Sequence, residues 1–162
     1  MAETPTSLRR ARDEDEPFLF DLYASTRSEE TAAWNWPAAQ VAAFLKLQFA
    51  AQRASYAMTY PTAEHSVILE DGRPIGRLLV NRSAAAICLV DISLLTGSRG
   101  HGIGSALIRQ LMQECSAAGS KLTLQVLCTN PARALYLRLG FRRVQGDAMY
   151  DQMQWSPENH SE

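Results

Sequence analysis

The chain has 162 residues, of which 46% are hydrophobic, and this composition suits one globular domain with a sizeable core. Its formal net charge of −1 argues against a broad cationic surface for nucleic acid or anionic lipid. No run approaches about 18 apolar residues and the N-terminus lacks an apolar signal core, so neither membrane spanning nor export is expected. Any bound anion must therefore be held by local geometry.

Cysteine and histidine placement adds two expectations. The three cysteines, Cys88, Cys115 and Cys128, are an odd number without metal-ligand spacing, which predicts reduced core residues of a cytoplasmic protein. The three histidines are scattered along the chain, so no metal site is expected.

The first third of the chain predicts a short strand and two helices. Residues 6–12 form the strand, and Asp13 caps a helix through residues 15–26, whose first turn is acidic as the helix dipole favours. Residues 28–36 lack a periodic pattern and are predicted to be irregular. Pro37 suits the first turn of a helix that ends near Tyr56.

The middle of the chain predicts an antiparallel pair followed by a parallel crossover. Residues 65–80 contain two apolar runs around Asp71-Gly72, the signature of a type I′ hairpin turn. The apolar run at 84–95 predicts a strand buried on both faces in the middle of a sheet. A helix from Gly102 to Gly119 and a strand at 121–127 then imply a right-handed crossover.

The last part predicts a short helix and two closing strands. Asn130 is the expected N-cap of the helix and Gly140 follows its end; the strands cover residues 141–146 and 148–155. Residues 156–162 are polar and are expected to be a disordered tail. We therefore predict one mixed α/β domain over residues 1–155, with a mostly antiparallel sheet of six to seven strands and about four helices.

The loop between the buried strand and the long helix has three glycines in five positions, at Gly100, Gly102 and Gly104. Unpaired amides at a helix start make a cradle for phosphate, whereas the alternative is a turn that needs glycine only for tight packing. The loop does not match the dinucleotide-binding pattern G-x-G-x-x-G, because the third glycine of that pattern would fall on Ser105. It does not match the nucleoside-triphosphate loop either, because that loop ends in Gly-Lys-Ser/Thr and no lysine is present here.

Residues 99–104 match R-x-x-G-x-G and resemble motif A of the GNAT superfamily of acyl-CoA-dependent N-acetyltransferases. Residues 130–141, NPARALYLRLGF, resemble the later motif of the same family, in which an asparagine and a tyrosine precede Leu-Gly-Phe. Both motifs occur in the family's order, and the resemblance covers residues 64–155. It implies the GNAT fold and acetyl-CoA as co-substrate.

The resemblance also implies which residues bind acetyl-CoA. The pyrophosphate would lie on the amides of the loop and of the helix start, with an arginine at the edge: Arg99, Gly100, Gly102, Ile103, Gly104 and Ser105. The backbone near Leu94 and Leu95 would pair with the pantetheine amides, and Asn130 would contact the cofactor. Arg133 is either a ligand of the ribose 3′-phosphate or an ordinary exposed helix arginine.

Catalytic roles follow for a tyrosine and a carboxylate. Tyr136 matches the family tyrosine that acts as general acid toward the departing thiolate, although a lone tyrosine here also suits packing. Several members of the family use a glutamate as general base midway along the fourth strand, and Cys88 lies near that position here. Asp91 is the nearest carboxylate, as base, as ligand of the acceptor ammonium, or as a structural group held by backbone donors. Glu64, His65 or a water chain are the alternative bases.

The resemblance thus implies direct transfer of acetyl from acetyl-CoA to a primary amine of a small molecule or peptide, in a ternary complex. The alternative is an acyl-CoA-binding sensor or assembly module without turnover. Aromatic residues suit either an acceptor-binding wall or packing: Trp34, Trp36, Tyr56 and Tyr60. Dimers are common in the family, so a homodimer is one expected arrangement, and no nucleic acid, membrane or metal is expected.

Overall fold

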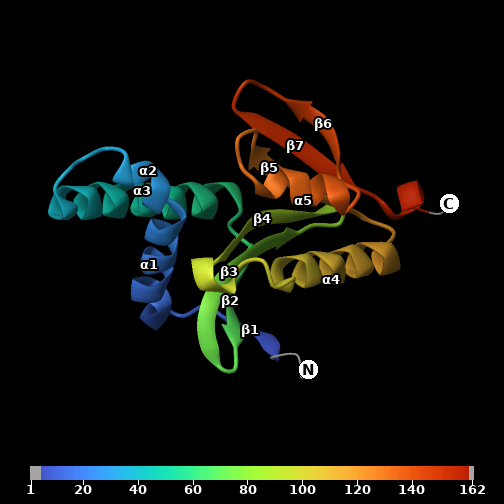
Figure 1. The fold of residues 1–162 in the computed structure, drawn as a ribbon. Coiled ribbons are helices and arrows are strands. Elements are labelled where there is room, and N and C mark those ends of the chain that lie inside the picture. Colours follow the sequence, from blue (N-terminus) through green and yellow to red (C-terminus); the bar gives the residue numbers. More distant parts are fainter. Residues whose placement is uncertain (1–4, 161–162) are drawn as a thin grey trace. The chain divides into compact units, whose positions relative to one another are not determined.

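The computed structural model describes residues 5–160, which form a seven-stranded sheet of order β1-β2-β3-β4-β5-β7-β6 with helices between the strands (Figure 1). The chain divides into two compact units, Met1–Leu78 with Ile92–Arg99, and Leu79–Asp91 with Gly100–Glu162. Strands β3, Arg73–Arg82, and β4, Ala86–Leu94, each contribute a segment to both units. The mixed α/β fold is confirmed.

The first unit also contains two strands and three α-helices. They are β1 Thr6–Arg10, α1 Glu16–Thr26, α2 Ser28–Ala32, α3 Ala38–Thr59 and β2 Glu64–Glu70. Strands β1 and β2 pair antiparallel, with Leu8 opposite Ile68. Helices α1 and α3 contact each other, and their apolar faces bury Leu22, Leu45 and Phe49.

The predicted hairpin between β2 and β3 is confirmed. Asp71 and Gly72 both have positive φ, 50° and 76°, which is the conformation that a type I′ turn requires. This turn places β2 beside β3 and fixes which residues of the two strands face the core, because side chains alternate between the faces of a sheet.

Three predictions for the first unit were wrong in detail. Part of the segment predicted to be irregular forms the five-residue helix α2. Asp13 opens a single 3₁₀ turn, and α1 begins at Glu16; the carboxylate of Asp15, not Asp13, accepts the Arg12 amide at 2.7 Å. Helix α3 continues three residues beyond Tyr56.

The second unit contains the remaining strands and helices: α4 Ile103–Ala118, β5 Lys121–Leu127, α5 Ala132–Arg138, β6 Arg142–Gly146 and β7 Tyr150–Trp155. Strand β5 pairs parallel with β4 and antiparallel with β7, so the predicted crossover through α4 is confirmed. Helices α4 and α5 both contact β5. Strand β7 lies between β5 and β6, which makes β6 an edge strand.

Other sequence predictions needed correction in this unit. Strand β4 is central, but only Ile87 and Leu89 are buried and its other residues are half-buried, so it is not covered on both faces throughout. Cys128 is exposed and therefore not a core residue, whereas Cys115 is buried. Pro157–His160 form a 3₁₀ turn where a disordered tail was expected, and residues 161–162 lie outside the described residues.

Candidate functional site

The glycine-rich loop turns the chain from β4 into α4 through two left-handed residues. Gly100 has φ +77°, and Gly102, the N-cap of α4, has φ +81°. Side chains rarely adopt this conformation, which explains glycine at both positions. The first amides of α4, from Ile103 onward, have no carbonyl partner within the helix and carry the positive end of its dipole.

Packing does not account for these two glycines. A Cβ built on Gly100 or on Gly102 would have no heavy atom of the described chain within 4 Å. The loop therefore presents backbone amides and open space rather than a tight protein contact. This arrangement suits the phosphate oxygens of a ligand, because a nest of amides and a helix N-terminus both attract anions.

The end of β4 leads into this loop with two backbone contacts. The Leu95 amide donates to the Ile75 carbonyl at 2.8 Å, and Arg99 donates through Nε to the Leu94 carbonyl at 2.9 Å. Because neighbouring residues of a strand point their backbone groups to opposite edges, the Leu94 amide and carbonyl point away from β3. Arg99 thus closes over the Leu94 carbonyl, while its guanidinium keeps its other N–H groups at the exposed surface.

Strands β3 and β4 approach each other closely at Gly76, a residue that the sequence analysis did not single out. A Cβ here would lie 2.3 Å from the Ser93 carbonyl oxygen and 2.8 Å from Cδ2 of Leu94. Glycine at this position is therefore required by contact rather than by φ. The contact fixes the backbone of Ser93 and Leu94 just before the glycine-rich loop.

Tyr136 and Asp91, the two predicted catalytic residues, both belong to the second unit. Tyr136 lies on α5 and is 7% exposed; its ring is 5.7 Å from that of Phe141. Burial, and after it the negative charge of Asp91, together raise the pKa of its phenol to about 12. Asp91, half-buried on β4, is thus close enough for its charge to act on Tyr136.

Two other predicted binding residues lie just before and within the first turn of α5. The helix starts at Ala132 with Pro131 as its N-cap, so the prediction that Asn130 is the N-cap was wrong by one residue. The Asn130 side chain still accepts the Ala132 amide at 2.9 Å. Arg133 donates through Nε to Asp151 at 2.6 Å. Asp151, which is buried, could not be predicted as a site residue from the sequence, because no motif marks an isolated acidic residue on a strand.

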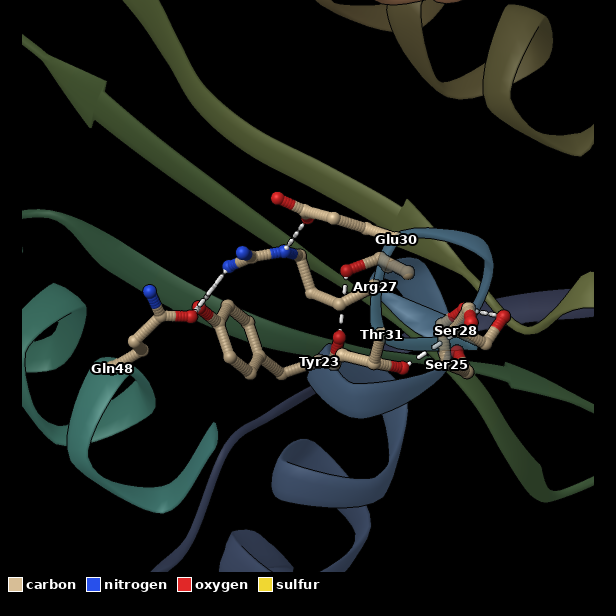
Figure 2. Close-up of polar contacts among 8 residues, drawn as sticks. Tyr23, Ser25, Arg27, Ser28, Glu30, Thr31 and Gln48 are labelled. Atoms are coloured by element: carbon tan, nitrogen blue, oxygen red, sulfur yellow. Dashed lines mark hydrogen bonds and ion pairs between the residues drawn. The ribbon is translucent and has the colours of Figure 1, made fainter. Parts of the chain in front are cut away.

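The first unit holds a polar network around Arg27, at the junction of α1 and α2 (Figure 2). The guanidinium donates to the Gln48 side chain at 2.7 Å and to the Tyr23 hydroxyl at 2.9 Å, and it pairs with Glu30. These contacts link α1, α2 and α3. They lower the pKa of Glu30 and raise that of Arg27, because each charge stabilises the other.

The aromatic residues of this unit pack on one another. Trp34 lies 4.9 Å from Trp36 and 5.3 Å from Phe44 between ring centroids, and Trp36 is 42% exposed. Tyr56 lies under the guanidinium of the buried Arg77, 5.7 Å from its centre. Packing thus occupies part of each ring. Trp36 is the most exposed of the four predicted aromatic residues, whereas Trp34, Tyr56 and Tyr60 are half-buried.

A groove of about 870 Å³ lies between α1 and α3. Phe20 and Phe49 form its apolar floor, and Glu16 pairs with Arg53 at 2.8 Å on its rim. None of the residues predicted for acetyl-CoA binding or catalysis lines it. Helix α3, which forms one wall, also exposes Leu47 and Met58.

The fold is that of a mixed α/β protein in which a glycine-rich loop opens the crossover helix α4. The family model of the acetyltransferase (GNAT) domain matches residues 61–143, more than half of the chain. The chain therefore belongs to the GNAT family of acetyltransferases.

Solved structures of acetyltransferases share this fold, two of them across almost the whole chain and one across more than half of it. The PaiA N-acetyltransferase from Thermoplasma acidophilum, in complex with coenzyme A, has a TM-score of 0.69 at 15% identity and covers 94% of this chain and 99% of its own. The ribosomal-protein-S18-alanine N-acetyltransferase from Escherichia coli has a TM-score of 0.59 at 18% identity, with 94% of both chains covered. Nourseothricin acetyltransferase is 26% identical with a TM-score of 0.50, over 59% of this chain and 66% of its own.

Within residues 5–160, no helix is long and apolar enough to cross a membrane. The same residues include no group of three histidine, cysteine or acidic side chains arranged to hold a metal ion.

Proposed function

We propose that this acetyltransferase transfers the acetyl group of acetyl-CoA to a primary amine of a small molecule or peptide, in one direct step. The observation that carries the proposal is the cradle at the start of α4. Gly100 and Gly102 are left-handed, nothing in the described chain lies within 4 Å of their Cβ positions, and the first amides of α4, which have no partner within the helix, follow directly. The coenzyme A bound to the PaiA relative supports this choice of ligand.

The cradle and its approaches are assigned to acetyl-CoA as follows. The pyrophosphate takes the loop and helix amides, of Gly100, Gly102, Ile103, Gly104 and Ser105, with Arg99 at the edge. The pantetheine amides pair with the backbone at Leu94 and Leu95, first with Leu94, because the Leu95 amide already donates to Ile75. Asn130 contacts the cofactor beyond its capping bond, and the outer N–H groups of Arg133 remain a candidate for the 3′-phosphate.

Tyr136 is assigned to the sulfur of the thioester, whose cleavage supplies the acetyl group. With a pKa of about 12, the phenol keeps its proton at any working pH and acts only as a donor. Full proton transfer to a thiolate of ordinary pKa, about 8.5, would be uphill by about 5 kcal/mol. Tyr136 therefore stabilises the departing thiolate by a hydrogen bond unless its pKa falls during the reaction.

Asp91 offers a physical reason for such a fall. If its carboxylate takes the proton that the acceptor ammonium releases, its negative charge disappears. That charge is one of the two causes that raise the pKa of Tyr136, so the phenol becomes a better acid when the thiolate departs. Glu64 and His65, at the start of β2, are the alternative bases.

The acceptor is the least specified partner. Among the similar proteins one is named for a ribosomal-protein alanine and another for nourseothricin, so both peptides and small molecules belong in a screen. The half-exposed Trp36 is the proposed contact for the apolar part of the acceptor. The three free cysteines support the proposal that the protein works in the cytoplasm.

The test is calorimetric titration of acetyl-CoA into the protein, with NADH and ATP as control ligands and Gly102→Glu as the matched variant. We expect acetyl-CoA alone to bind, and Gly102→Glu to abolish binding because a carboxylate would occupy the cradle. Binding of all three ligands, or of none, would contradict the assignment of the cradle.

Turnover separates the enzyme from the acyl-CoA sensor that the sequence left open. Amines from both classes are screened by release of free thiol, and Tyr136→Phe is compared with the unsubstituted protein. An enzyme loses kcat in Tyr136→Phe while it retains acetyl-CoA affinity. Tight binding of acetyl-CoA, with no release of coenzyme A thiol in the presence of any amine tested, would favour the sensor.

A further inference from the structure

We propose that Asp151 is a positioning residue that fixes helix α5, and with it Tyr136, through an ion pair with Arg133. The inference rests on the proposed function, since it concerns the residue assigned to the thioester sulfur. It assigns Arg133 to the architecture of the site rather than to the 3′-phosphate.

The carboxylate of Asp151 is a buried junction between three elements. Asp151 is 3% exposed on β7, and each of its oxygens accepts a hydrogen bond from one arginine. Arg133 of α5 donates through Nε to Oδ2 at 2.6 Å, and Arg143 of β6 donates through Nε to Oδ1 at 2.7 Å. The two arginines lower the pKa of Asp151, so the carboxylate stays charged.

The chain leaves room for this junction at a glycine. A Cβ on Gly146 would lie 2.7 Å from Oδ1 of Asp151, 2.8 Å from the Tyr150 carbonyl oxygen and 2.9 Å from Nη2 of Arg143. Its φ lies outside the left-handed range, so close contacts, and not the backbone conformation, explain glycine here. The backbone of the β6–β7 hairpin and the ion pair of Asp151 together occupy the space that a side chain would need.

Helix α5 depends on such an anchor because it has only seven residues. A helix this short is not stable by itself, so tertiary contacts decide where it lies. Arg133 precedes Tyr136 by three residues, about one turn, and the two side chains therefore lie on neighbouring parts of the helix surface. Tyr136 has a second anchor in Phe141, whose amide donates to the Tyr136 carbonyl at 3.0 Å.

The two arginines give a matched pair of substitutions. Both bind the same carboxylate at nearly equal distances, but only Arg133 belongs to the helix that carries Tyr136. Arg133→Ala should lower kcat by about 10- to 100-fold, the effect of a catalytic group displaced by roughly 1 Å. Arg143→Ala should lower kcat less. Arg82→Gln, which breaks the ion pair with Glu114 in the same unit, should leave kcat unchanged.

Two readouts separate positioning from a purely structural role and from phosphate binding. The first is the NMR signal of tyrosine labelled at the ring carbon that bears the hydroxyl, with the Tyr136 signal assigned through Tyr136→Phe. We expect this signal to move in Arg133→Ala and to stay in Arg143→Ala. The second readout compares acetyl-CoA with its 3′-dephospho analogue. We expect Arg133→Ala to lose kcat to the same extent with both ligands, and to change Kd little for either.

The results have distinct meanings. The inference would be overturned if Arg133→Ala changed neither the Tyr136 signal nor kcat. A defect confined to weaker acetyl-CoA binding that vanishes with the dephospho analogue would also overturn it, since Arg133 would then be a phosphate ligand. If the unsubstituted protein shows no turnover, the proposed function fails, and the Tyr136 signal still decides the positioning role.

Discussion

The glycines at the two ends of helix α4 provide a controlled test of the acetyl-CoA cradle. Gly102 at the N-cap and Gly119 at the C-cap both have left-handed φ, +81° and +64°, and neither has a heavy atom of the described chain within 4 Å of its Cβ position. Alanine at either position costs about 1 kcal/mol of folding free energy, because the left-handed conformation disfavours a Cβ. For a domain of this size, that loss lowers Tm by about 3 °C.

The two substitutions differ in whether the new methyl group enters space assigned to acetyl-CoA. In Gly102→Ala the methyl group enters the space assigned to the pyrophosphate, so we expect acetyl-CoA to bind at least about tenfold more weakly, which is about 1.4 kcal/mol. In Gly119→Ala the methyl group points away from any proposed ligand, and Kd should stay the same. Thermal denaturation measures the shared cost, and calorimetry measures the difference.

Two results would refute this reasoning. Equal affinities for acetyl-CoA in the two variants would show that the space beside Gly102 is not used by the ligand. A much larger fall in Tm for Gly102→Ala than for Gly119→Ala would show that a packing contact, absent from the structure, explains the glycine.

Three further predictions concern other parts of the chain. Gly76→Ala should lower Tm more than Gly102→Ala, because its Cβ overlaps the Ser93 carbonyl; an equal or higher Tm than Gly102→Ala would contradict the close strand contact. Asp15→Asn should reduce the free energy of unfolding at neutral pH, since the pKa of Asp15 is lowered from 3.8 to about 2, mainly by its hydrogen bonds from Arg9. That contribution is present above the unfolded pKa and is lost as pH falls toward 2, so denaturant curves for the two proteins should converge there. Asp91→Asn should lower the pKa of Tyr136, measured by NMR titration of its labelled ring, and burial should keep it above 10; an unchanged value would remove the proposed coupling.

Local sequence rules were sufficient for features whose cause is local. The Asp71-Gly72 turn follows from the need for positive φ at two successive residues, and the structure has both. Gly119 ends α4 for the same reason. The glycine loop followed from its position between a strand and an amphipathic helix, and the structure shows that conformation, not packing, requires Gly100 and Gly102.

Features that depend on distant partners were missed. Helix α2 was predicted to be irregular because five residues carry no periodic signal; in the structure, Arg27 links this helix to Gln48 on α3, a contact between residues 21 apart (Figure 2). Asp151 belongs to no motif, and only the fold brings Arg133 to it from 18 residues away. Gly76 appeared ordinary because the carbonyl that excludes a side chain belongs to another strand.

The sequence by itself determined the family, the order of the strands and of the helices other than α2, and the residues that form the proposed cradle, since each depends on neighbours along the chain. Only the tertiary structure decided that Tyr136 is buried within the influence of Asp91 and that Arg133 is bound to a buried carboxylate. The physical reason is that burial and charge act through space. A pKa or an ion pair depends on the groups that the fold assembles, whereas a turn or a helix cap depends on the few residues that form it.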